Sequence, residues 1–182
     1  MPSINDWPGR SAAERLRQWP RILELAEASA SRPFLGVVVL GSFARGDADD
    51  LSDVDFIVFA AEGDFEEAWE ERHRLHSLDA ACWDYPRPPG DRDVAGHRWL
   101  TSDLVLFDGL IATPSGTRVA DPLHILVGDD SLSRQLVGRA PITAEEQHRR
   151  KDEITLHEVE QLYGQLKLAL RAHRRGSVTS SL

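Results

Sequence analysis

The sequence contains little cysteine and no long apolar run. Cys82 is the single cysteine among 182 residues, so neither an intramolecular disulfide nor a zinc cluster of cysteines can form. Residues 1–6 lack the charged region and apolar stretch of a signal peptide, and no apolar run is long enough to span a membrane. We therefore expect a cytoplasmic protein with no membrane partner. The neighbours Ala81 and Trp83 predict that Cys82 lies on a buried strand and is not a catalytic thiol.

Lysine is also scarce. The formal net charge is −9, the only lysines are Lys151 and Lys167, and no basic run is long enough to form a nucleic-acid footprint. Binding to nucleic acid is therefore disfavoured. No internal repeat or low-complexity segment is present, and 182 residues suit one domain, or one domain with a helical appendage.

The most informative stretch covers residues 41–55 and reads GSFARGDADDLSDVD. An apolar run, 34–40, precedes it and a second, 56–60, follows it. Both runs are short, rich in β-branched or aromatic residues, and bounded by glycine or acidic residues, which is typical of buried strands. We therefore expect a polar turn between two strands.

Two carboxylates lie at the end of this stretch. Asp53 and Asp55 are two residues apart, so on a strand they point to the same face, roughly 6.6 Å apart along the axis. Their repulsion raises the pKa of one of them unless a cation lies between them, and oxygen ligands that face phosphate favour Mg²⁺. At the other end, Gly41 and Ser42 offer backbone N–H groups and a hydroxyl to a phosphate. The simpler alternative is an acidic surface turn.

These residues together resemble a known family. Gly41-Ser42, a spacer containing Ala44-Arg45-Gly46, and Asp53-Val54-Asp55 before an apolar strand resemble the nucleotidyltransferase superfamily of DNA polymerase β. The similarity covers residues 37–59 and is greatest to the minimal and aminoglycoside-type members. It implies an α+β (α/β-like) nucleotidyltransferase fold, with a mixed β-sheet flanked by helices.

The resemblance also implies a third carboxylate on a strand beside the Asp-x-Asp strand. The apolar segment 99–114 contains this strand, and Asp108 is the first candidate because an unpaired carboxylate inside an apolar run is costly. Asp103, at the start of the strand, is the second candidate. A third possibility is that neither serves, which would leave a metal site without turnover.

The implied chemistry is the transfer of a nucleoside monophosphate. Asp53, Asp55 and Asp108 would be catalytic and hold one or two Mg²⁺ ions, and Gly41 and Ser42 would bind the phosphates of a nucleoside triphosphate, expected to be ATP. Arg45 would neutralise phosphate charge. The alternative for Arg45 is a surface arginine that pairs with an aspartate at 47 or 49.

Two functions remain open. The protein is either an enzyme that transfers AMP to a hydroxyl of a small molecule or a protein and releases pyrophosphate, or a catalytically weak nucleotide- or partner-binding module, such as an antitoxin-type minimal nucleotidyltransferase. Beyond Val127 there is room for little more than one long helix. We therefore expect only a short form of the helical domain that often completes the acceptor pocket in the larger antibiotic-modifying members. A homodimer could supply the missing wall.

The remaining segments predict helices and one loop. Residues 11–14 begin a helix that Pro20 bends or splits, and residues 64–67 begin another. That second helix carries His73 and His76, whose spacing can bind metal, although surface histidines are favoured because no third soft ligand is evident. Residues 85–93 form a proline-rich loop that either covers the triphosphate or is a disordered connection.

The domain organisation follows from the last helical pattern. Residues 143–146 have the form of a capping box and begin a long amphipathic helix that ends near Gly176. We therefore expect a nucleotidyltransferase domain at 1–138, a C-terminal helical appendage at 139–176 and a tail at 177–182.

Overall fold

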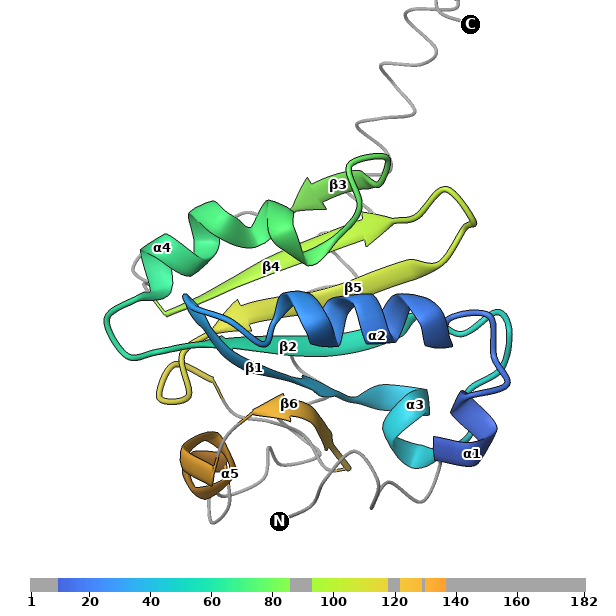
Figure 1. Ribbon diagram of the computed structural model, residues 1–182, viewed down its shortest axis with the longest axis horizontal. Helices are drawn as coiled ribbons and strands as arrows, with labels where there is room; N and C mark the ends of the chain where they lie inside the picture. Colours follow the sequence, from blue (N-terminus) through green and yellow to red (C-terminus); the bar gives the residue numbers. More distant parts are fainter. Residues whose placement is uncertain (1–9, 86–92, 118–121, 129, 137–182) are drawn as a thin grey trace, which may run out of the picture. The chain divides into compact units, whose positions relative to one another are not determined.

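The computed structural model of the chain describes residues 10–85, 93–117, 122–128 and 130–136 (Figure 1). The chain divides into two units, Met1–Pro141 and Ile142–Leu182, and every described residue belongs to the first. The expected long C-terminal helix, the boundaries at 138 and 176, and most of the proline-rich loop therefore lie outside the described residues.

The described part contains a six-stranded mixed sheet with the order β3-β4-β5-β2-β1-β6. The strands are β1 Phe34–Val39, β2 Val54–Ala60, β3 Ala81–Asp84, β4 Val94–Leu100, β5 Leu106–Ala112 and β6 His124–Gly128. Strands β2 and β5 pair in parallel, and each other neighbouring pair is antiparallel. The predicted α+β fold with a mixed sheet and flanking helices is confirmed.

The helices are short. They are α1 Arg10–Ala13, α2 Trp19–Ala28, α3 Gly41–Arg45, α4 Phe65–Glu70, the 3₁₀ helix η2 Glu71–Leu75, and α5 Asp130–Leu136. Pro20 lies in the first turn of α2, where its missing N–H costs no hydrogen bond. The expected split of the N-terminal helical region into two helices is therefore observed. Among the described residues, no helix combines the length and the apolar character that a membrane crossing requires.

The centre of the sheet is apolar on both faces because β2 is buried along almost its whole length. On one face, Phe56 and Val58 pack against Ile22 of α2 and Phe65 of α4, and Figure 1 shows these two helices over the same side of the sheet. On the other face, a smaller cluster joins β1, β2, β5 and α5; it consists of Val38, Ile57, Phe59, Ala112 and Leu132. Each fully buried Val, Leu, Ile or Phe side chain in these clusters contributes about 1.5–3 kcal/mol, so the sheet holds the residues at the ends of its strands firmly.

The apolar segment 99–114 spans the end of one strand and the whole of the next. Strand β4 ends at Leu100 and β5 begins at Leu106. Between them, the backbone N–H of Val105 donates to Thr101 Oγ1 at 2.9 Å, and Leu104 has a positive φ of 62°. Trp99 and Phe107 then stack with ring centroids 4.7 Å apart, which joins the two strands within the core.

Three local predictions need correction. The polar stretch after β1 is not only a turn, because residues 41–45 form the one-turn helix α3. Cys82 lies on a strand as expected, but that strand, β3, is at the edge of the sheet and Cys82 is exposed. His73 and His76 do not share a helix, because η2 ends at Leu75 and His76 has extended backbone.

Candidate functional site

Three carboxylates meet at the ends of the two parallel strands. Asp53 directly precedes β2, Asp55 is the second residue of β2, and Asp108 is the third residue of β5. The parallel register pairs Asp55 with Asp108. One oxygen of each carboxylate lies within 4.8 Å of the others, so the three residues form a compact cluster that could hold a metal ion.

The cluster is electrostatically strained. The pKa of Asp55 is raised to about 6, first because the carboxyl is partly buried and then because the charges of Asp53 and Asp108 repel it. The positive charges of Arg45 and Arg98 act in the opposite direction and lower this pKa. A divalent cation would relieve the repulsion, and hard carboxylate oxygens are the ligands that Mg²⁺ prefers.

Gly41 lies directly against this cluster. The backbone N–H of Leu40 donates to the carbonyl oxygen of Asp55 at 2.9 Å, which brings the end of β1 to the start of β2. Gly41 has a φ of +59°, and a Cβ atom at this position would lie 1.9 Å from Oδ2 of Asp55. Glycine is therefore required both for the backbone conformation and for the position of the Asp55 carboxylate.

Ser42 and Arg45 belong to α3, the short helix that begins at Gly41. The first N–H groups of a helix have no intrahelical partner, so this end of α3 offers donors next to the carboxylate cluster. Arg45 forms an exposed ion pair with Asp47, with Nε 3.2 Å from Oδ2. The surface pairing that we gave as the alternative for Arg45 is thus present, while its charge still acts on Asp55.

Arg98 of β4 and Tyr85, which directly follows β3, both contact Asp108. Arg98, opposite Asp108 in the β4–β5 register, donates from its guanidinium to Oδ2, and the Tyr85 hydroxyl donates to Oδ1 at 3.3 Å. The Arg98 guanidinium also lies 4.7 Å from the centre of the Tyr85 ring. The sequence did not point to Arg98 or Tyr85, because this contact depends on the hairpin register and no local motif specifies it.

Two residues before α2 fix the loops that lead to the carboxylates. Gln18 is fully buried, and its Nε2 donates to the carbonyl oxygen of Ser52 at 2.9 Å. Arg17 donates to the carbonyl oxygen of Asp50 at 2.7 Å and to that of Leu104 at 3.2 Å. The loop before β2 and the turn before β5 are therefore tied to the same short segment. Neither residue was identified from the sequence, since a polar residue before a helix has no distinctive pattern.

Asp103, the second candidate for the third carboxylate, is not part of the cluster. It lies in the turn between β4 and β5, and its Oδ2 is 3.3 Å from Nε of Arg21. The structure therefore places Asp108, and not Asp103, beside Asp53 and Asp55.

Comparison with known proteins gives a match over the part of the chain that contains Asp53 and Asp55. Residues 24–104 match the family model described as a nucleotidyltransferase domain. The match includes Gly41, Ser42, Asp53 and Asp55 and ends just before β5. No curated protein matches the chain significantly.

The raised pKa of Asp55 predicts a pH-dependent stability effect. In the metal-free protein, the native pKa of about 6 lies above the usual value of 3.8, so folding favours the protonated form and the stability contributed by Asp55 is lost as the pH rises through about 6. We expect Asp55→Asn to raise the free energy of unfolding on the order of 1 kcal/mol at about pH 8, with a smaller gain near pH 4. Urea unfolding with a chelator present measures this difference.

The exposed Asp50→Asn variant is the control, and we expect its free energy of unfolding to match the wild type at both pH values. If Asp55→Asn raised the free energy of unfolding by the same amount at both pH values, the conclusion that the charged Asp55 carboxylate is repelled in the folded protein would be contradicted.

Because Gly41 lies so close to Asp55, we predict that one methyl group added at position 41 weakens metal binding. We expect Gly41→Ala to displace the Asp55 carboxylate and weaken Mg²⁺ binding at least about tenfold, because a misplaced ligand loses its coordination geometry. Isothermal titration calorimetry measures the affinity. Gly63→Ala is a matched control, since Gly63 also has a positive φ, of 91°, but no atom lies within 4 Å of its added Cβ.

Both glycine variants carry the same kind of backbone strain, so both should lose stability by about 1 kcal/mol. Equal Mg²⁺ affinity in the two variants would show that the space beside Asp55 is not what Gly41 provides.

Proposed function

Because residues 24–104 match the family model of a nucleotidyltransferase domain, we propose that the chain transfers AMP from ATP to a hydroxyl group of a small molecule or a protein. Pyrophosphate is the second product. The single observation that supports this proposal most strongly is the cluster of Asp53, Asp55 and Asp108 beside Gly41.

The donor set fits magnesium. Asp53, Asp55 and Asp108 offer only carboxylate oxygens, and their mutual repulsion leaves a surplus of negative charge that a divalent cation would neutralise. These three residues would hold one or two Mg²⁺ ions. When bound, Mg²⁺ would supply the positive charge that stabilises the reacting phosphate and the leaving pyrophosphate.

The segment after β1 would bind the triphosphate. Gly41 has no side chain to obstruct the phosphates, and Ser42 contributes a hydroxyl and a backbone N–H at the start of α3. Arg45 would exchange its exposed partner Asp47 for a phosphate oxygen. Such a surface ion pair contributes roughly 0–1 kcal/mol, so the exchange costs little.

The chemical step would then be an in-line displacement. The acceptor hydroxyl oxygen forms a bond to the α-phosphorus of ATP, the bond between this phosphorus and the β-phosphate oxygen breaks, and pyrophosphate leaves. Asp108 would take the hydroxyl proton, since one of its oxygens lies within the cluster and the carboxylate is oriented by Arg98 and Tyr85. The Arg98 guanidinium and the Tyr85 hydroxyl hold the Asp108 carboxylate in one orientation, so it moves less before it takes the proton.

The first test concerns ATP binding. We expect the double variant Asp53→Asn with Asp55→Asn to lose Mg²⁺-dependent ATP binding in calorimetry while its thermal unfolding remains cooperative. Two neutral amides no longer attract the cation that joins the protein to the triphosphate. Asp103→Asn, which removes a carboxylate outside the cluster, is the matched control and should bind ATP as the wild type does. Unchanged ATP affinity in the double variant would refute the site assignment.

The second test concerns turnover. Incubation with labelled ATP, Mg²⁺ and candidate acceptors should produce, by mass, an acceptor that has gained AMP. We expect Asp108→Asn to slow transfer about 100-fold or more, because a general base typically contributes at least that much. The alternative function, a weakly catalytic binding module, predicts ATP binding with no labelled product from small molecules or polypeptides.

A further inference from the structure

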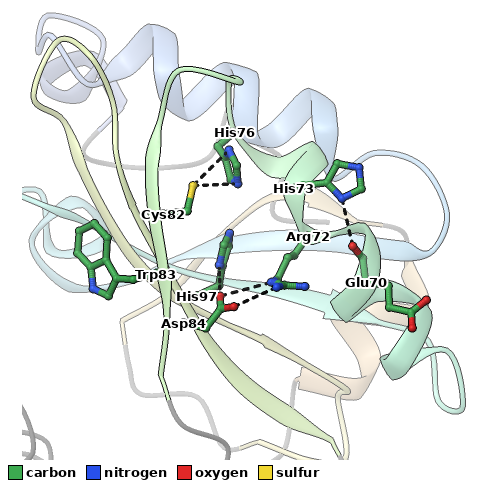
Figure 2. Close-up of a pocket in the computed structure, with 8 residues that line it drawn as sticks. All are labelled: Glu70, Arg72, His73, His76, Cys82, Trp83, Asp84 and His97. Atoms are coloured by element: carbon green, nitrogen blue, oxygen red, sulfur yellow. Dashed lines mark hydrogen bonds and ion pairs between the residues drawn. The ribbon is translucent and has the colours of Figure 1, made fainter. Parts of the chain in front are cut away.

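A pocket lies on the face of the sheet opposite to the carboxylate cluster. It opens between η2 and the edge strand β3, and its lining includes Arg72, His76, Cys82, Asp84 and His97 (Figure 2). In the antiparallel β3–β4 register, Asp84 lies opposite His97 and Cys82 lies opposite Trp99. Side chains alternate along a strand, so these residues share the face toward η2, whereas Arg98 meets Asp108 on the other face.

His97 is the fixed part of this pocket. Its side chain is 3% exposed, and its Nδ1 donates to Oδ1 of Asp84 at 2.7 Å. The other oxygen of Asp84 accepts from Arg72 at 3.0 Å. Nε2 of His97 is buried and has no hydrogen-bond partner among the described residues. Leaving such an atom without a partner costs about 1–3 kcal/mol, which a ligand in the pocket would offset.

His76 and Cys82 line the same pocket as this nitrogen. Nδ1 of His76 is 3.0 Å from the carbonyl oxygen of Ser77, and Nε2 is 3.3 Å from Sγ of Cys82. The ring centroids of His76 and His97 are 5.4 Å apart, and Figure 2 shows the His97 ring between His76 and Asp84. In each histidine an oxygen acceptor occupies Nδ1, which leaves the Nε2 lone pair available.

We propose that this pocket is a Zn²⁺ site, in which the Cys82 thiolate and Nε2 of His76 and of His97 are the protein ligands. One thiolate and two imidazoles form a soft donor set that selects zinc over magnesium. The contact of His97 with Asp84 is the carboxylate–histidine pair that orients metal-binding imidazoles. A water molecule would complete the tetrahedron. Binding would release the thiol proton to solvent and join the segment after η2 to strands β3 and β4.

The metal-free pocket must adjust before it binds zinc. Within the described parts of the chain, only the aspartate cluster already has three ligand atoms within 4.8 Å of one another. His97 is held by Asp84, so His76 and Cys82 would rotate toward it; Cys82 is exposed and His76 is only partly buried. The partial burial of the Cys82 sulfur and the charge of Asp84 raise the pKa of Cys82. Without metal, Cys82 is therefore a thiol and not an activated nucleophile.

Cobalt provides the direct test, since a Co²⁺–thiolate bond gives a charge-transfer band that carboxylates do not. The full chain with Asp53→Asn and Asp55→Asn is treated with a chelator and titrated with Co²⁺, so that the aspartate cluster does not contribute. We expect a charge-transfer band that saturates at one equivalent and disappears when Zn²⁺ is added. Because the aspartate cluster is disabled, the result does not depend on the proposed nucleotidyl transfer.

Single substitutions then assign the ligands. Cys82→Ser should abolish the band, and His76→Gln or His97→Gln should weaken Co²⁺ and Zn²⁺ affinity at least about tenfold. His73→Gln is the matched control: His73 lines the same pocket but is exposed, and Figure 2 shows its ring beside Glu70 and away from Cys82, so the metal affinity of this variant should match that of the wild type.

His97 is buried, so the partly exposed His76 carries the test if His97→Gln does not fold. Absence of the thiolate band, or wild-type affinity in His76→Gln, would overturn the proposal.

Discussion

The repulsion among three carboxylates is the constraint on which the rest of the site depends. Asp55 and Asp108 are neighbours in the parallel register of β2 and β5, and Asp53 is two residues away, so the backbone itself brings the negative charges together. The apolar sheet holds them there, because β2 is buried on both faces. Gly41 leaves the space that the Asp55 carboxylate occupies. The charge repulsion and the positive φ of Gly41 are each costly for stability, and a bound cation would offset the repulsion.

The sheet separates two chemically different groups of residues. Along β4, Arg98 points toward Asp108, while His97 and Trp99 point toward the helical face. One face therefore gathers hard oxygen ligands with arginines nearby, and the other gathers imidazole nitrogens and a thiol. This separation follows from the alternation of side chains along a single strand. A magnesium site and a zinc site, as proposed above, would therefore not compete for the same ligands.

The sequence alone predicted the parts of the site that depend on local pattern. The alternation of Asp53 and Asp55 and the cost of a carboxylate in an apolar run both hold independently of the tertiary fold, and they pointed to the residues that the structure brings together. The contacts of Arg98 could not be predicted, because they depend on the register between β4 and β5. Cys82 was predicted to be buried because its apolar neighbours do not distinguish an edge strand from a central one.

The most direct measurement of the central claim is the pKa of Asp55 itself, followed by NMR of its carboxyl carbon with and without Mg²⁺. In the metal-free protein we expect a value of about 6, because burial and the charges of Asp53 and Asp108 disfavour ionisation. Saturating Mg²⁺ should lower the pKa well below that value, since the cation stabilises the carboxylate. A metal-free pKa near the ordinary 3.8 that Mg²⁺ does not change would contradict the account.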